Sequence, residues 1–120
     1  MSEFQITARM QEIRSSQSRL YSASATLSGG HGQLGSLDSS VANVASAMDA
    51  TLAGSSRGVD QRVKGHLLDA SRSARAVQGH ISDAISLVRN AQNRLEDEYR
   101  SLQRQLEAIE AEKRRRRNNA

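Results

Sequence analysis

The segment that decides the fold is residues 6–48, which divides into the seven-residue blocks ITARMQE, IRSSQSR, LYSASAT, LSGGHGQ, LGSLDSS and VANVASA, followed by Met48. A strict seven-residue repeat keeps its members on one side of an α-helix, as in helices that pack in coiled coils. The first member of every block is large and apolar: Ile6, Ile13, Leu20, Leu27, Leu34, Val41 and Met48. The second row, four residues further on, is mostly small or polar: Met10, Gln17, Ser24, His31, Asp38, Ala45 and Leu52.

A glycine-rich stretch, SGGHGQLG over residues 28–35, lies inside this repeat. Each glycine in a helix interior costs about 1 kcal/mol relative to alanine, so the stretch has the composition of a loop. The apolar phase nevertheless continues from Leu27 to Leu34, and a loop has no reason to preserve it. We therefore expect one helix over about 3–53, weakened or kinked at 29–35. A true break there, giving three helices in the chain, is the alternative.

The second half of the chain carries an apolar repeat with alternating steps of four and three residues. Its members are Val63, Leu67, Ala70, Ala74, Val77, Ile81, Ala84, Val88, Ala91, Leu95, Tyr99, Leu102, Leu106 and Ile109. The consecutive four-residue steps around Tyr99 predict a stutter, which locally relaxes a left-handed supercoil. We expect a second helix over about 59–114 and a basic tail over 113–120.

Residues 54–58, GSSRG, separate the two repeats and supply a glycine to end one helix and a serine to cap the next. Folding the chain there predicts a single all-α domain over 1–120. This domain is an antiparallel, coiled-coil-like hairpin of two helices, in which residue i faces about residue 112 − i. The chain contains no proline, which favours nearly continuous helix.

Each expected helix has more apolar width than one neighbouring helix covers, because Leu37, Val44, Leu68, Ile85 and Leu87 flank the seam. A two-helix hairpin with 2% aromatic residues buries little surface and should be marginal alone. We therefore predict that it completes a four-helix bundle with itself or with a partner. The predicted seam and partner-binding residues are Ile13, Leu20, Leu27, Leu34, Val41, Met48, Leu68, Val77, Ile81, Ile85, Val88 and Leu95.

The net charge of +4 is unevenly distributed, since residues 1–58 are neutral and residues 59–120 hold 13 basic against 9 acidic side chains. Five of the basic residues form one run: Lys113, Arg114, Arg115, Arg116 and Arg117. We interpret the run as the end of helix two, where positive charge complements the helix dipole. It has no interleaved aromatic residues for base stacking, so nucleic acid is a weaker interpretation, and so is an anionic membrane.

The residues that could carry chemistry form no convincing site in the sequence. His31, His66 and His80 each follow a glycine, and only His31 and His80 could meet across the hairpin, as a polar layer rather than a metal site. The acidic run at 96–98 is expected to be a solvated face. A two-helix rod offers no pocket for an oriented nucleophile and base, so we expect neither an enzyme nor a cofactor.

The turn reads Leu52-Ala53-Gly54, a large apolar residue two places before a glycine that permits the reversal. In its length, its hairpin architecture, its lack of cysteine and this L-x-G sequence, the chain resembles the WXG-motif family of small type VII secretion proteins. That family has a W-x-G in the turn and a C-terminal Y-x-x-x-D/E signal. Here no tryptophan occurs, and Tyr99 is followed four residues later by Gln103.

The chain looks more like the small helical accessory partners of LXG-domain toxins, a resemblance that implies a non-enzymatic protein that binds a toxin's helical domain. It implies a bacterial cytoplasmic protein, or one exported without a cleavable signal peptide. The first residues lack a basic segment followed by an apolar one, and no run of about 18 apolar residues occurs. The alternatives are a homo-oligomeric coiled coil of a phage or cytoskeletal assembly and, more weakly, a nucleic-acid-binding coiled coil.

Overall fold

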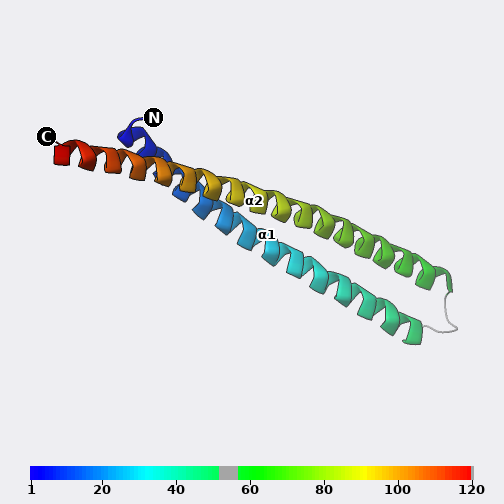
Figure 1. Cartoon of the computed structure of the whole chain (residues 1–120). Helices are drawn as coiled ribbons and strands as arrows, with labels where there is room; N and C mark the ends of the chain where they lie inside the picture. The colour runs from blue at the N-terminus through cyan, green and yellow to red at the C-terminus, as the bar shows by residue number, and fades with distance from the viewer. Residues whose placement is uncertain (52–56, 120) are drawn as a thin grey trace. The chain divides into compact units, whose positions relative to one another are not determined.

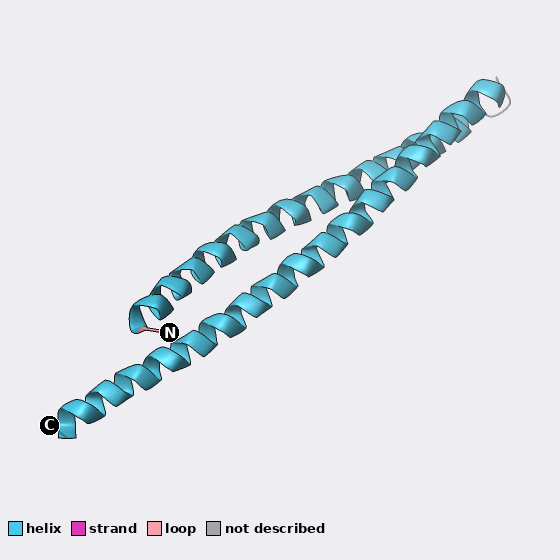
Figure 2. Cartoon of the chain, turned by 90° about the horizontal axis from the view of Figure 1, so that it is seen from above, coloured by secondary structure: helices cyan, strands magenta, loops and turns pink. Residues whose placement is uncertain are grey.

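The computed structural model describes the backbone of residues 1–51 and 57–119, and the side chains of residues 1–48 and 61–119. Two long helices, α1 (Glu3–Thr51) and α2 (Arg57–Asn119), make up almost all of this part of the chain (Figure 1). No strand occurs among the described residues (Figure 2). The predicted all-α, two-helix hairpin is therefore confirmed.

The helix bounds differ from the expected ones at two places. α1 is helical without interruption across residues 28–35, so the described chain has two helices and not three. α2 continues to Asn119, five residues past the expected end at 114. Arginine is a good helix former, and Glu112 lies 3.5 Å from Arg116, one turn further on, which supports the extra turn.

The structure describes only part of the expected turn at 54–58. Arg57 and Gly58 already belong to α2. The remainder of the turn, with the motif residues Leu52 and Gly54, lies outside the described residues.

The chain divides into two compact units, and each contains a part of both helices. Unit 1 combines Met1–Ser24 with Leu87–Ala120, and unit 2 is Ala25–Ser86. Within both units the helices pair close to the predicted register. Gly30 faces Ile81 in unit 2, where residue 82 was expected, and Arg14 contacts Glu96 in unit 1, where residue 98 was expected.

Unit 1 contains the apolar core. Ile6 and Ile13 are 1% and 0% exposed, and they pack with Leu102, which is 5% exposed. The partly buried side chains around them are Met10, Leu95, Tyr99, Leu106 and Ile109. The start of α1 is fixed by a capping box, in which the Ser2 N–H donates to Gln5 Oε1 at 2.9 Å and the Gln5 N–H donates to Ser2 Oγ at 3.2 Å.

Unit 2 has a thinner and more polar interior. Among the side chains described there, Ala74 and Ser71 are buried, and the apolar row of α1 is only half-buried. Asp38 accepts a hydrogen bond from the Ser71 hydroxyl, and Gln78 Nε2 donates to the carbonyl of His31 at 3.1 Å. Polar groups paired inside a seam fix its register but bury less apolar surface than unit 1 does.

The inward face of α2 follows a simpler repeat than the sequence suggested. One row recurs every seven residues, and its members are all buried or half-buried: Leu67, Ala74, Ile81, Val88, Leu95, Leu102 and Ile109. The second row passes through Ser71 and Gln78, while Ala70 and Val77 face outward. The predicted stutter is therefore not needed. It arose because the row through Ala70, Val77, Ala84 and Ala91 was followed in place of the row beside it, Ser71, Gln78, Ile85 and Gln92, which is in phase with Tyr99.

No helix in the described part of the chain combines the length and the apolar character needed to cross a bilayer.

Candidate functional site

The predicted seam residues of α1 turn inward in both units. Ile13 is buried, and Leu20, Leu27, Leu34, Val41 and Met48 are half-buried. On α2 the same holds for Ile81, Ile85, Val88 and Leu95. Two of the predicted residues lie outside the seam, since Leu68 is 56% exposed and Val77 is 45% exposed. These two side chains are available to another molecule and do not hold the hairpin together.

In unit 1 both flanks of the seam are closed by polar contacts between the helices. On one flank Arg9 makes two parallel bonds to Glu98, at 2.7 Å from Nε and 2.8 Å from Nη2. On the other, Glu96 accepts hydrogen bonds from Arg14 at 3.1 Å and from Gln17 at 2.9 Å. The acidic run at 96–98 was expected to be a solvated face, and Glu96 and Glu98 keep part of their surface exposed, but the hairpin register also pairs both of them with cations of α1.

These contacts shift the acid–base equilibria of both glutamates. The Arg9 hydrogen bond lowers the pKa of Glu98 from its ordinary 4.5, and the Gln17 hydrogen bond, with Arg14 adding to it, lowers the pKa of Glu96. A carboxyl group with a lowered pKa in the folded state binds fewer protons than it does in the unfolded chain. Its contribution to stability is thus complete above the unfolded value and is lost as the pH falls through the folded value.

We therefore expect the midpoint of thermal unfolding to be nearly constant from pH 7 to about pH 5. It should fall as the pH is lowered further past 4.5, the ordinary pKa of these carboxyl groups. Circular dichroism melting curves would measure this. The variant Glu98→Gln should flatten the dependence below pH 4.5, whereas Glu107→Gln, at an exposed position of the same helix, should retain it. If the unfolding midpoint of Glu98→Gln depended on pH as strongly as that of the unaltered chain, Glu98 would not be a source of the loss of stability below pH 4.5.

In unit 2 the Asp38 contacts with Ser71 and Arg75 lie within the seam and on one flank. Ser71 donates to Asp38 and lowers the pKa of that carboxyl, and Arg75 adds a contact at 3.2 Å. The charged residues Asp69, Arg72 and Arg75 of this unit lie either on the same flank as Leu68 or further around α2, away from α1. The sequence already pointed to the polar contact between Asp38 and Ser71, because Asp38 belongs to the second row of α1, which is mostly small or polar.

The other flank of unit 2 is apolar and open. Each position on this flank lies one residue before a residue of the second row. In an antiparallel pair of helices, the positions that lie one residue before the second row of either helix are all on the same side of the seam. Arg9 and Glu98 of unit 1 are one such pair, because they precede Met10 and Tyr99. We call the residues that occupy these positions in unit 2 the apolar flank: Gly30, Leu37, Val44, Val63, Ala70, Val77 and Ala84.

The apolar flank exposes substantial apolar surface without any charge. Leu37 is 51% exposed, Val44 is 49% exposed and Val77 is 45% exposed. The next row outward contains no Asp, Glu, Lys or Arg and consists of Thr26, Gln33, Ser40, Ala47, His66, Ser73 and His80. Unit 2 as a whole holds five basic and five acidic residues, so the net charge of +4 resides in unit 1. Thus one side of unit 2 resembles a seam that lacks its partner.

The remaining predicted site residues are placed as follows. Tyr99 is half-buried, with the Arg14 guanidinium 3.6 Å above its ring centroid, and Gln103 is exposed. His31 is half-buried, whereas His80 is exposed. No group of three or more His, Asp or Glu side chains that could hold a metal ion occurs among the described residues.

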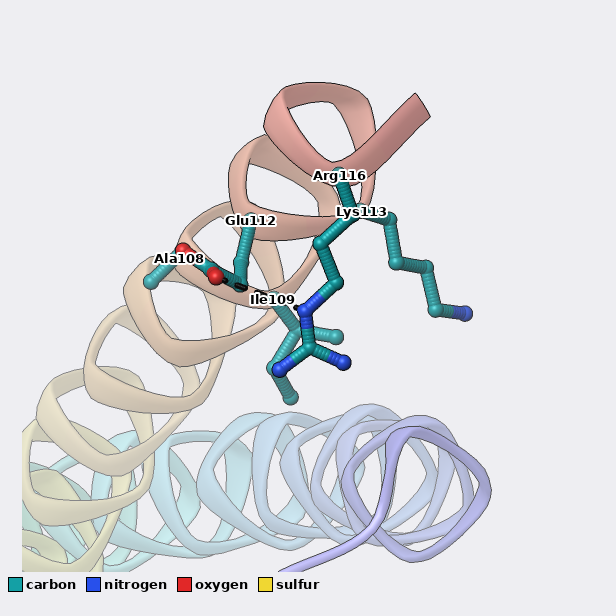
Figure 3. A pocket seen from close by; sticks show the side chains of 5 residues that line it. All are labelled: Ala108, Ile109, Glu112, Lys113 and Arg116. Carbon is teal, nitrogen blue, oxygen red and sulfur yellow. Dashed lines mark ion pairs between the residues drawn. The ribbon is translucent and has the colours of Figure 1, made fainter. Parts of the chain in front are cut away.

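The basic run is helical and exposed throughout: Lys113, Arg114, Arg115, Arg116 and Arg117. A shallow hollow beside it is lined by Ala108, Ile109, Glu112, Lys113 and Arg116. Figure 3 shows Ile109 and Arg116 pointing from α2 toward α1. This end of unit 1 is therefore a charged surface with a small apolar floor.

Comparisons of the chain with protein-family models, curated protein sequences and solved structures found no match.

Proposed function

We propose that this chain is a non-enzymatic helical binding protein that pairs with the helical domain of a larger exported protein, in the manner of the accessory partners of LXG-domain toxins. The secretion setting is supported by the resemblance in length, architecture and L-x-G sequence. The binding activity is supported by an observation on the molecule itself, the uncharged apolar flank of unit 2.

The apolar flank of unit 2 and the same flank of unit 1 carry different residue types at equivalent positions of the repeat. In unit 1 the position pair is Arg9 with Glu98, which closes the seam. In unit 2 the equivalent positions of α1 hold Leu37 and Val44, and those of α2 hold Val63 and Val77. Residues beside a coiled-coil seam are commonly charged, because they face water. Apolar residues at these positions support the proposal that a further helix covers them.

The dimensions and energetics suit a helix as the partner. The flank runs over residues 63–84 of α2, which is about 33 Å at 1.5 Å per residue and matches roughly six turns of a partner helix. Covering the exposed halves of Leu37, Val44 and Val77 would contribute roughly 2–4 kcal/mol from these three side chains. The small residues Gly30, Ala70 and Ala84 alternate with them and leave room for side chains of an incoming helix.

The test is co-expression with the helical domain of an exported protein encoded beside this chain, followed by size-exclusion chromatography. Val44→Glu should abolish co-elution, weakening the complex at least 100-fold, because it would bury an unpaired carboxylate. The matched control is Leu68→Glu, an equally apolar and exposed position of unit 2 on the other flank, which should still co-elute. Both variants should keep the helicity of the free chain.

Equal loss of co-elution in Val44→Glu and Leu68→Glu would refute the assignment to the apolar flank. Failure of every neighbouring helical domain to bind would refute the secretion-partner function. Filaments or large homo-oligomers of the chain alone, seen together with that failure, would favour the structural coiled-coil alternative.

A further inference from the structure

The cationic end of α2 has more charge than its helix dipole accounts for. The dipole acts within the last turn, where Arg116 and Arg117 lie. Arg115 and Arg116 lie 3.9 and 3.5 Å from Glu112, and Lys113 pairs with Glu3 of α1. Arg114 and Arg117 form no ion pair within the described part of the chain. From residue 113 to residue 119 there is no acidic side chain.

A second feature of the same unit lies beside this charge. Phe4 is 82% exposed and Met1 is 71% exposed, and Phe4 has the largest exposed fraction of any large apolar side chain described. The Glu3–Lys113 pair brings the first turn of α1 against the cationic stretch. Glu3 also lines one hollow together with Arg114 and Arg117. Phe4, whose ring lies outside the core around Ile6 and Met10, is thus in the same helical turn as the residue that pairs with Lys113.

We propose that this end of unit 1, formed by Met1, Phe4 and residues 113–117, binds the surface of an anionic lipid bilayer. Cations attract acidic headgroups, and exposed apolar side chains enter the interface, so the two features together supply what weak peripheral binding requires. The ion pairs to Glu3 and Glu112 do not oppose this, because exposed pairs are weak and exchange readily. The surface is distinct from the apolar flank of unit 2, so the proposal is independent of the proposed function.

A bilayer fits these residues better than a nucleic acid does. Binding of single strands uses successive aromatic rings on which bases stack, and residues 105–119 contain none. The exposed Phe4 and Met1 offer one ring and one flexible aliphatic chain, which suit an apolar interface.

The chain offers a direct spectroscopic test, because it contains no tryptophan. In the full-length variant Phe4→Trp, tryptophan emission should shift to shorter wavelength on adding vesicles of phosphatidylcholine with about one third phosphatidylserine. It should not shift with vesicles of phosphatidylcholine alone, and 0.5 M NaCl should reverse the shift. The matched reporter is Tyr21→Trp, a 73% exposed aromatic position of the same unit, which should show no shift.

Vesicle sedimentation then measures the contribution of the cations. Each surface cation contributes about five-fold in affinity, so Arg114→Gln with Arg117→Gln should weaken binding about 25-fold. The charge-matched control is Arg89→Gln with Arg94→Gln, two exposed arginines of unit 1 outside the run, which should retain most of the binding.

Equal binding to neutral and anionic vesicles would overturn the proposal, and so would equal losses in the two double variants. An unshifted Phe4→Trp emission on bound protein would overturn the role of the apolar pair. If anionic vesicles are not bound while duplex DNA is, with the same dependence on Arg114 and Arg117, the surface is a nucleic-acid site and the proposal is wrong.

Discussion

Replacing Ile13 with alanine is expected to lower the free energy of unfolding by about 3 kcal/mol, within the 2–5 kcal/mol typical of buried isoleucine truncations. Ile13 is 0% exposed and packs against Leu102 in the core of unit 1. The two-helix arrangement provides few other side chains to refill the space that the truncation leaves. Since small proteins are stable by about 5–15 kcal/mol, the loss would be a large part of the total.

Urea denaturation followed by circular dichroism would measure the loss. The matched control is Tyr21→Ala, which removes a larger side chain from an exposed position of the same helix and unit. It should change the free energy of unfolding by no more than about 0.5 kcal/mol. Similar losses in the two variants would show that the core does not lie where the structure places it.

Replacing four glycines of unit 2 with alanine is expected to raise the free energy of unfolding by about 3–4 kcal/mol. The four are Gly29 and Gly32 in α1 and Gly65 and Gly79 in α2, and a Cβ added at each would meet nothing within 4 Å. All lie in helix interiors, where glycine costs up to about 1 kcal/mol relative to alanine. Because the added methyl groups cause no clash, the full gain should appear in urea denaturation.

Two further changes make this prediction specific to the helical geometry. Gly35→Ala should gain much less, because its Cβ would lie 3.1 Å from Nε2 of Gln78 and displace the bond that this group donates to the carbonyl of His31. Ala42→Gly, at an exposed interior position of α1, should lose about 1 kcal/mol. If residues 28–35 formed a loop, Gly29→Ala and Gly32→Ala would be neutral or destabilising.

The two units differ in how the same repeat is packed. Unit 1 closes its seam with a buried apolar core and with the Arg9–Glu98 and Arg14–Glu96 contacts on its two flanks. Unit 2 keeps the phase of the repeat but has the Asp38–Ser71 pair inside and apolar side chains outside. A seam of this kind specifies its register at a cost in stability, which a bound partner helix would restore.

Part of the candidate surface was accessible from the sequence. The sequence predicted Leu37, Val44 and Leu68 as apolar residues beyond the seam, and all three are exposed. It did not separate Leu68 from Leu37 and Val44, because the assignment to a flank depends on which row of α2 faces α1. Following Val77 as a seam residue hid that it belongs with Leu37 and Val44. The pairing of Glu3, the chain neighbour of Phe4, with Lys113 of the basic run was also not predicted.

The sequence by itself determined the two helices and their approximate pairing. The seven-residue spacing from Ile6 to Met48 requires a continuous helical phase, and it outweighs the unfavourable propensity of four glycines over residues 29–35. Only the tertiary structure decided which rows of α2 meet α1 and where the core ends. The rows that face each other depend on the rotation of one helix about its axis. Burial of Ser71 and Gln78 beside Asp38 and His31 fixed that rotation, and hydropathy alone favoured their apolar neighbours Ala70 and Val77.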